Sequence, residues 1–563
     1  MDDIRDYFGE KIAFYFAFMH HYTVWLAMLG VPAILPLILQ LISPSAVCGH
    51  LYTNTTNTSL ITSTFCAGAG SDTALVPFYA IGSAMWAVYF FKYWRRYQAA
   101  LEFRWDVSDF AAEEPTRPEF HRHPSTKHDR KGFYSKEAGF MPFGDTPTPY
   151  FAGSARGGRF GAGIALTLFL MMVIVIGTLG IFAIRLALRE GASLGARMGS
   201  GASVFGFAIN QSTVAMLVGA ILNTLFIGVM NVIYRKCGVI LTDWENHRTD
   251  TEYENSLIYK NSIFQAVNSY TSFFYIAFAK PQDPNLFGTM LPIDENGTVV
   301  QAGSATHIPG AYIPLLDECN NDGDCMRDLV VQMIVVVIVK SYVRNLREFL
   351  GPCFRMCCFS CTAKGKGSAK REDELSGVSK LTHESGLPSA RGIYWEYNEM
   401  AIQFGYCIMF AAAAPWASTL CLLNNAFERK ADAMRMLYGQ QRPVYLGASN
   451  IGAWASVFEA LSFAAIVSNI AILGVTSDSL REVYGMDDST VLWLCLILEH
   501  AIIVWKFVVA VRVKDAPLWV LKARAYQEWL VARGEEDEKP KALDAALLQA
   551  AYDDDDDLER FFL

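Results

Sequence analysis

The chain has 563 residues, of which 52% are hydrophobic and 18% are charged. Ordinary soluble domains carry roughly 25% charged residues, so this composition favours a protein much of whose surface avoids water. The formal net charge of -9 argues against nucleic acid as a partner, because neutralising a phosphate backbone needs a basic face.

The apolar residues gather in runs that can cross a bilayer, whose hydrocarbon core of roughly 30 Å takes about 20 helical residues. A charged start and a long first run argue against a cleaved signal peptide. Pro415 divides one long apolar block into two spans. We therefore predict an all-α integral membrane protein with ten transmembrane helices, at 15–43, 75–97, 160–188, 206–235, 263–282, 326–351, 396–414, 416–437, 450–474 and 490–513.

Loop chemistry predicts the orientation of these helices, because glycans and disulfides belong outside the cell whereas Lys and Arg gather inside. The loops after the first and fifth spans carry both outside features. The glycosylation candidates are Asn54, Asn57, Asn210 and Asn296, and the disulfide candidates are Cys48 with Cys66 and Cys319 with Cys325. Basic residues instead fill the segment from Arg95 to Lys131. An even number of spans then leaves both termini in the cytosol.

The predicted organisation is a short cytosolic N-terminus at 1–14, a ten-helix domain at 15–513 and an acidic cytosolic tail at 514–563. Two cytosolic linkers, 98–159 and 352–395, connect helices within the domain. The second linker holds four cysteines that fit either palmitoylation or a zinc site, namely Cys353, Cys357, Cys358 and Cys361. We expect a multi-pass protein of the plasma membrane or an endomembrane.

Acidic residues lie inside the predicted spans as well as in the loops. Glu396 and Glu399 open the seventh span, and Glu428 and Asp432 lie near the end of the eighth. Spacings of three and four residues put each pair on one helical face. Pro415 lies 16 residues after Glu399 and 13 before Glu428, which is roughly 24 and 20 Å along a helix. The helical hairpin therefore returns both pairs to a similar depth.

A fifth carboxylate, Glu348, reaches a similar depth on the sixth span, with Asn345 one turn away. Each charge inside a span costs roughly 2.5–3.5 kcal/mol, so carboxylates at one level need positive charge beside them. A calcium ion meets this need, because it binds about six to eight oxygens from carboxylates, amides and water. Magnesium fits less well, since it demands octahedral geometry and keeps its waters.

Two other arrangements remain open at this point. Basic side chains could pair with the carboxylates, and the positive end of the seventh helix could stabilise Glu396 and Glu399. The basic residues nearest in sequence are Arg344, Arg347, Arg429, Lys430 and Arg435.

The acidic segments WEYNEMAIQFGY (395–406) and LLNNAFERKADA (422–433) resemble the paired acidic motifs of the anoctamins, a family of calcium-activated channels and lipid scramblases. Further blocks resemble the same family in the same order, and together they span nearly the whole chain: IRDYFGEKIAFYF (4–16), FRWDVSDF (103–110), LTDWENHRTDTEYENSLIYK (241–260), AVNSYTSFFYIAFAK (266–280) and QRPVYL (441–446).

The resemblance implies a homodimer with ten helices per subunit and, in each subunit, a membrane-facing groove walled by roughly the third to seventh helices. It also implies two calcium ions held between helices six, seven and eight by Glu348, Glu396, Glu399, Glu428 and Asp432. The family often has an asparagine where this chain has Arg344, so the resemblance assigns no amide ligand there. Asn345, one place later, is the candidate for that role.

Two more departures from the family concern regulation. A further calcium site of the family is formed by acidic residues of helices two and ten. This chain matches that site at Asp515, but it has Lys92 and Ala510 at the other positions that are acidic in the family. We expect that site to be degraded. The chain also begins almost at its first span, so we expect it to lack the N-terminal cytosolic domain typical of the family.

The resemblance favours a calcium-activated chloride or other anion channel, and the alternative is a calcium-activated phospholipid scramblase on the same scaffold. Within the groove, Lys340 would attract an anion, and Asn223, Ser269, Ser272 and Tyr275 would add polar contacts, although such residues also serve packing. The partners implied are membrane lipids and chloride or other small ions. A membrane enzyme is the rival class, but no histidine falls within the acidic blocks and no nucleophile motif appears. A structural tether is a third reading.

Overall fold

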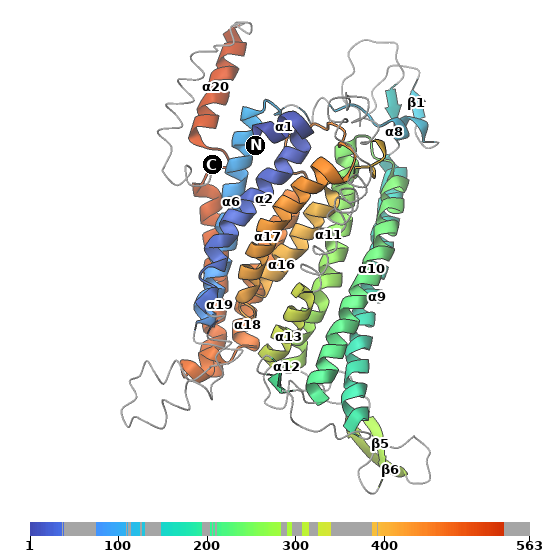
Figure 1. Cartoon of the computed structure of the whole chain (residues 1–563), viewed down its shortest axis with the longest axis vertical. Coiled ribbons are helices and arrows are strands. Elements are labelled where there is room, and N and C mark those ends of the chain that lie inside the picture. Colours follow the sequence, from blue (N-terminus) through green and yellow to red (C-terminus); the bar gives the residue numbers. More distant parts are fainter. Residues whose placement is uncertain are drawn as a thin grey trace, which may run out of the picture.

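The computed structural model describes residues 1–35, 38, 75–108, 110, 114–123, 127–129, 148–151, 153–193, 203–204, 207–208, 211–282, 290–294, 307–314, 325–338, 385–390 and 392–533. Long helices run side by side through an elongated bundle (Figure 1). Two sets of shorter elements mark opposite ends of the bundle. One end carries α1 (Asp2–Phe8), α8 (Pro118–Arg122) and α20 (Leu518–Arg533), and the other carries β5 (Met290–Asp294) and β6 (His307–Pro314).

Each predicted span overlaps a helix in the part of the chain that the structure describes, although residues 339–351 of the sixth span lie outside that part. In chain order these are α2 (Glu10–Gly30), α6 (Val76–Arg104), α9 (Gly153–Ser193), α10 (Gln211–Glu245), α11 (Asp250–Phe274), α13 (Cys325–Val337), α16 (Tyr394–Met409), α17 (Trp416–Met434), α18 (Trp454–Val475) and α19 (Asp488–Arg512). Among the described residues, five helices are long and apolar enough to cross a membrane: α2, α9, α10, α18 and α19.

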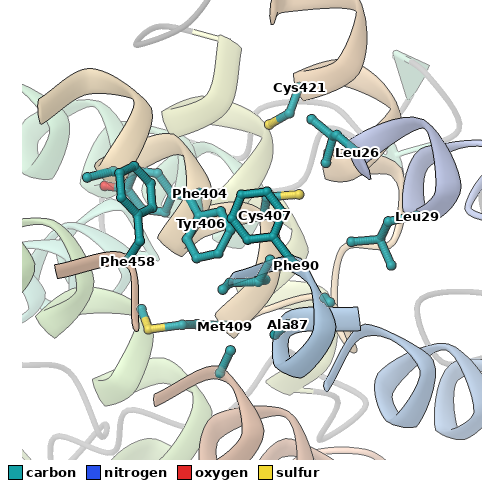
Figure 2. Packing of buried hydrophobic residues seen from close by; sticks show 14 of the residues in the cluster. Leu26, Leu29, Ala87, Phe90, Phe404, Tyr406, Cys407, Met409, Cys421 and Phe458 are labelled. Atoms are coloured by element: carbon teal, nitrogen blue, oxygen red, sulfur yellow. The ribbon is translucent and has the colours of Figure 1, made fainter. Parts of the chain in front are cut away.

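The centre of the bundle is an aromatic core. Helix α16 packs against α11, α17 and α18, while α2 packs along α17 and α6 along α18. Phe404 of α16 lies between Phe90 of α6 and Phe458 of α18, with ring centroids 5.3 and 5.2 Å away (Figure 2). Burying an aromatic ring removes a large apolar area, and edge-to-face ring pairs add to packing. This core holds the α16–α17 hairpin against the rest of the protein.

The outer helices expose apolar surface. Leu168 of α9, Leu225 of α10 and Leu492 of α19 are 58%, 62% and 66% exposed, and large apolar patches of this kind are rare on soluble monomers. Hydrocarbon is as apolar as a leucine side chain, so these faces suit contact with lipid. The protein is therefore a multi-pass helical membrane protein.

The long helices carry the fold, as predicted, and three short antiparallel strand pairs lie outside them. They are β1 (Lys127–Asp129) with β2 (Thr148–Tyr150), β3 (Ser203–Val204) with β4 (Phe207–Ala208), and β5 with β6. All three pairs occur in segments that connect long helices. Apolar periodicity predicts the helices but gives no signal for pairings this short.

The described residues include three π-helical segments: η1 (Tyr275–Ala279), η3 (Arg435–Gly439) and, between α18 and α19, η4 (Ser479–Val483). The first joins α11 to α12 (Lys280–Gln282), and the second continues α17 beyond Met434. Such turns are rare and occur often at functional sites.

Gly405 allows α11 to approach α16 closely. A Cβ atom at this position would lie 1.9 Å from the hydroxyl oxygen of Tyr270 on α11. That hydroxyl donates a hydrogen bond to the backbone oxygen of Ile402, 3.1 Å away. A larger residue at 405 would therefore push the two helices apart.

We predict that Gly405→Ala lowers the thermal stability of the purified protein, because the added methyl overpacks this contact at a cost of about 1–3 kcal/mol. The matched control is Gly82→Ala on α6, where an added Cβ would meet nothing within 4 Å. Tryptophan fluorescence during heating in detergent measures both. A Gly405→Ala variant that melts no lower than Gly82→Ala would contradict the close contact.

Candidate metal centre

The α16–α17 hairpin brings buried carboxylates together. The chain turns between Met409 and Trp416, and Pro415 stands at the N-cap of α17, so the start of α16 meets the end of α17. Glu396 comes from the first turn of α16, and Glu428 and Asp432 from the last turns of α17. One oxygen of each lies within 4.8 Å of the others, and the three residues are 7%, 5% and 3% exposed.

The three carboxylates, which we call the acidic cluster, are held by side chains from two helices and a π-helical turn. Tyr15 of α2 donates from its hydroxyl to Asp432 Oδ2 at 2.5 Å. Asn424 donates from Nδ2 to Glu428 Oε2 at 2.9 Å. Arg435, the first residue of η3, donates from Nη2 to Glu396 Oε1 at 2.8 Å and to Asp432 Oδ1 at 2.9 Å.

Counted over the described residues of the cluster and its printed ion pairs alone, negative charge exceeds positive charge. Three carboxylates and one guanidinium sum to a formal charge of -2 (three negative, one positive). Of the other basic residues on α17, Arg429 contacts His20 Nδ1 at 3.0 Å and Lys430 is exposed. Closely spaced carboxylate oxygens are the donors that calcium prefers, so the donor set of the acidic cluster fits a calcium ion.

The structure brings together three of the five carboxylates predicted from the sequence. Glu399 lies one turn beyond Glu396 on α16, is partly exposed and is not a member of the acidic cluster. Glu348 and Asn345 lie outside the described residues, as do Arg344, Arg347 and Lys340. The pairing of Arg435 is one of the alternatives that the sequence left open.

The groove candidates lie in the contacts between α10, α11 and their neighbours. Asn223 of α10 donates from Nδ2 to the Ser272 hydroxyl of α11 at 3.0 Å, and both are buried. The Tyr406 hydroxyl of α16 donates to the backbone oxygen of Ser269 at 3.1 Å. Tyr275 starts η1 and packs on Phe182 of α9, with ring centroids 4.4 Å apart.

The loop candidates fall mostly outside the described residues. That is so for Cys48, Cys66 and Cys319, for the cysteines at 353–361, and for all four glycosylation candidates. Cys325, at the start of α13, is disulfide-bonded.

Sequence reasoning missed a second buried ionic group, near the end of the bundle opposite α1. Asp328 of α13 accepts from Lys280 Nζ of α12 at 2.5 Å and from Arg185 Nη2 of α9 at 3.1 Å. The Lys280 and Asp328 side chains are 0% and 1% exposed. Because these residues are far apart in sequence, periodicity within one helix could not pair them.

Residues 4–527 match the sequence model of a family described as "Anoctamin: Calcium-activated chloride channel". The chain belongs to the anoctamin family. It is 30% identical to anoctamin-7 of Mus musculus over 508 residues, which cover 86% of this chain and 53% of that protein. It is 29% identical to anoctamin-4 of Bos taurus over 517 residues, which cover 86% of this chain and 51% of the relative.

A third relative, anoctamin-5 of Mus musculus, is 29% identical over 522 residues, which cover 86% of this chain and 53% of the relative. The chain thus spans about half the length of the curated relatives it matches. The family resemblance predicted from the motifs is confirmed.

This anoctamin carries a lysine where the resemblance placed a further calcium site. Lys92 Nζ of α6 donates to Asp515 Oδ1 at 2.7 Å and to the backbone oxygen of Ala510 at 3.1 Å. The ammonium group thus binds the matching carboxylate directly. This arrangement supports the expectation that the site is degraded.

We predict that Tyr15→Phe destabilises this anoctamin, because Asp432 loses a buried hydrogen bond of the charged type, which contributes about 1.5–3 kcal/mol. Tyr397→Phe is the matched control, because the Tyr397 ring lies 5.4 Å from that of Tyr15 and its hydroxyl has no hydrogen-bond partner among the described residues. Melting temperatures of both variants in calcium-free detergent buffer check the prediction. Equal melting temperatures would show that the Tyr15 hydroxyl does not stabilise the cluster.

Proposed function

We propose that this anoctamin is a calcium-activated membrane transport protein that conducts chloride or other small anions. The observation that carries the proposal is the acidic cluster, in which Glu396, Glu428 and Asp432 lie buried within 4.8 Å of one another in a chain of this family. The family description names a calcium-activated chloride channel. These three residues, with Glu399 and Glu348 as further candidates, would hold calcium, which when bound supplies positive charge to the carboxylates.

The rest of the proposed architecture follows the family. We propose ten transmembrane helices per subunit, a homodimer, cytosolic termini and a membrane-facing groove in each subunit. The groove would be lined in part by Asn223, Ser269, Ser272 and Tyr275, with Lys340 as the group that attracts an anion.

Helix α16 offers a direct physical connection between the acidic cluster and the groove candidates. Asn398 lies on α16 only two residues after Glu396, and its side-chain oxygen accepts a hydrogen bond from Asn261 Nδ2 of α11 at 3.1 Å. Farther along the same two helices, Tyr406 donates to the backbone of Ser269. A shift of α16 caused by neutralising Glu396 would therefore move α11, on which Ser269, Ser272 and Asn268 lie. We propose that this movement opens the ion pathway.

We predict that the purified chain in liposomes shows chloride flux that depends on calcium. Glu428→Gln removes one carboxylate of the acidic cluster and should raise the calcium concentration needed for half-maximal flux by roughly tenfold or more, a change of about 1.4 kcal/mol or more in binding. The control is Glu482→Gln, the same chemical change at an exposed residue of η4. It should leave the calcium dependence unaltered.

The same vesicles distinguish the other functions when a fluorescent lipid reports exchange between leaflets. Rapid calcium-dependent lipid exchange without chloride selectivity would show that the protein is a scramblase and not a chloride channel. Flux that ignores calcium, or a Glu428→Gln variant with native calcium dependence, would refute the role of the acidic cluster. The absence of both activities would favour a structural tether.

A further inference from the structure

The side chain of Arg435 lies within the acidic cluster itself. It follows Asp432 by three residues, belongs to η3 and contacts Glu396 on the facing end of α16. The Arg435 side chain is 14% exposed, so most of the guanidinium group is out of water. Arg435 thereby ties the two arms of the α16–α17 hairpin together.

Arg435 uses carboxylate oxygens that a metal ion would need. Nη2 of Arg435 binds Glu396 Oε1 and Asp432 Oδ1, and Tyr15 binds the remaining oxygen of Asp432. Calcium is held at about 2.3–2.6 Å from its ligand oxygens, and two like charges at such short separations repel strongly in a low-dielectric interior. A guanidinium and a divalent ion that bind the same oxygens therefore oppose each other.

We infer that Arg435 is a built-in cation of the acidic cluster, which binds Glu396 and Asp432 when no divalent ion is present and leaves them when one binds. This inference rests on the proposed function, since it assigns the cluster a divalent ion. Arg435 then acts as an internal competitor that lowers calcium affinity. It also stabilises the ion-free protein, because it supplies positive charge to buried carboxylates.

The backbone around Arg435 is suited to such an exchange. Arg435 begins a π-helical turn that ends at Gly439, after which the chain leaves helical structure at Gln440. A π turn is rare and occurs frequently at functional sites. The carboxylates, by contrast, lie on regular α-helix, so the arginine side chain can move without unwinding the helices that carry them.

The test is calcium binding by isothermal titration calorimetry on the full chain in detergent, with Arg435→Met compared with the native protein. Removing the competitor should tighten calcium binding by about tenfold or more, since the ion no longer displaces two charge-assisted hydrogen bonds. The calcium-free melting temperature should fall in the same variant, so the rise in melting temperature caused by saturating calcium should grow.

The matched control is Arg429→Met, which removes the same charge from α17 next to Glu428, although Arg429 contacts His20 rather than the cluster. If Arg435 acts only through its long-range field, the two variants should tighten binding equally, and that result would overturn the inference. Arg435→Lys keeps the charge but loses the planar guanidinium, so it should bind calcium with intermediate affinity. If Arg435→Met fails to fold, Arg435→Lys provides the test. A calcium affinity of Arg435→Lys equal to that of the native protein would then overturn the inference.

The outcomes also separate the inference from the proposed function. Native protein that binds calcium, with an Arg435→Met variant of equal or weaker affinity, would refute the competition by Arg435 and leave calcium binding intact. Failure of the native protein and of all three variants to bind calcium would refute both.

Discussion

Buried carboxylates repel one another and need positive charge close by, and this constraint shapes the junction of α2, α16 and α17. One oxygen of each of Glu396, Glu428 and Asp432 lies within 4.8 Å of the others, and the guanidinium of Arg435 pairs with two of these residues. Tyr15 and Asn424 donate hydrogen bonds to the same group. Each charge placed inside a span costs roughly 2.5–3.5 kcal/mol, so an arrangement of this kind persists only where the surrounding helices hold it.

The surrounding helices do so through the aromatic core. Phe404 of α16 packs between Phe90 and Phe458, and Gly405 admits Tyr270 of α11 against the same helix. The hairpin turn at Pro415 then fixes where α17 returns. Within the junction, the parts that can rearrange without unwinding an α-helix are the Arg435 side chain and its π-helical turn. Under the proposed function, a change of charge at the cluster would act on α16 through Glu396, which lies in its first turn.

The sequence predicted the helices and the acidic residues better than it predicted their partners. Apolar runs and Pro415 placed the helices because bilayer thickness sets span length, although α11 begins at Asp250 rather than at 263, since its first turns are polar. The spacing of Glu428 and Asp432 put both on one face of α17, as observed. Tyr15 lies 417 residues from Asp432, so no local pattern could pair them.

The contacts of Arg435 could be predicted only in part from the sequence. Its position three residues after Asp432 makes an ion pair geometrically possible, but the contact with Glu396 depends on how the hairpin closes. The neighbouring Arg429, equally close to the acidic residues in sequence, turns instead to His20. The choice between the two arginines is made by tertiary packing.

We propose that the acidic cluster binds a divalent cation in place of an arginine. The decisive experiment is electron cryomicroscopy of the full chain at saturating calcium and in chelator. We expect ion density between Glu396, Glu428 and Asp432 in calcium, with the Arg435 guanidinium withdrawn from Glu396. An Arg435 side chain that still bridges Glu396 and Asp432 at saturating calcium, with no ion density beside it, would contradict this proposal.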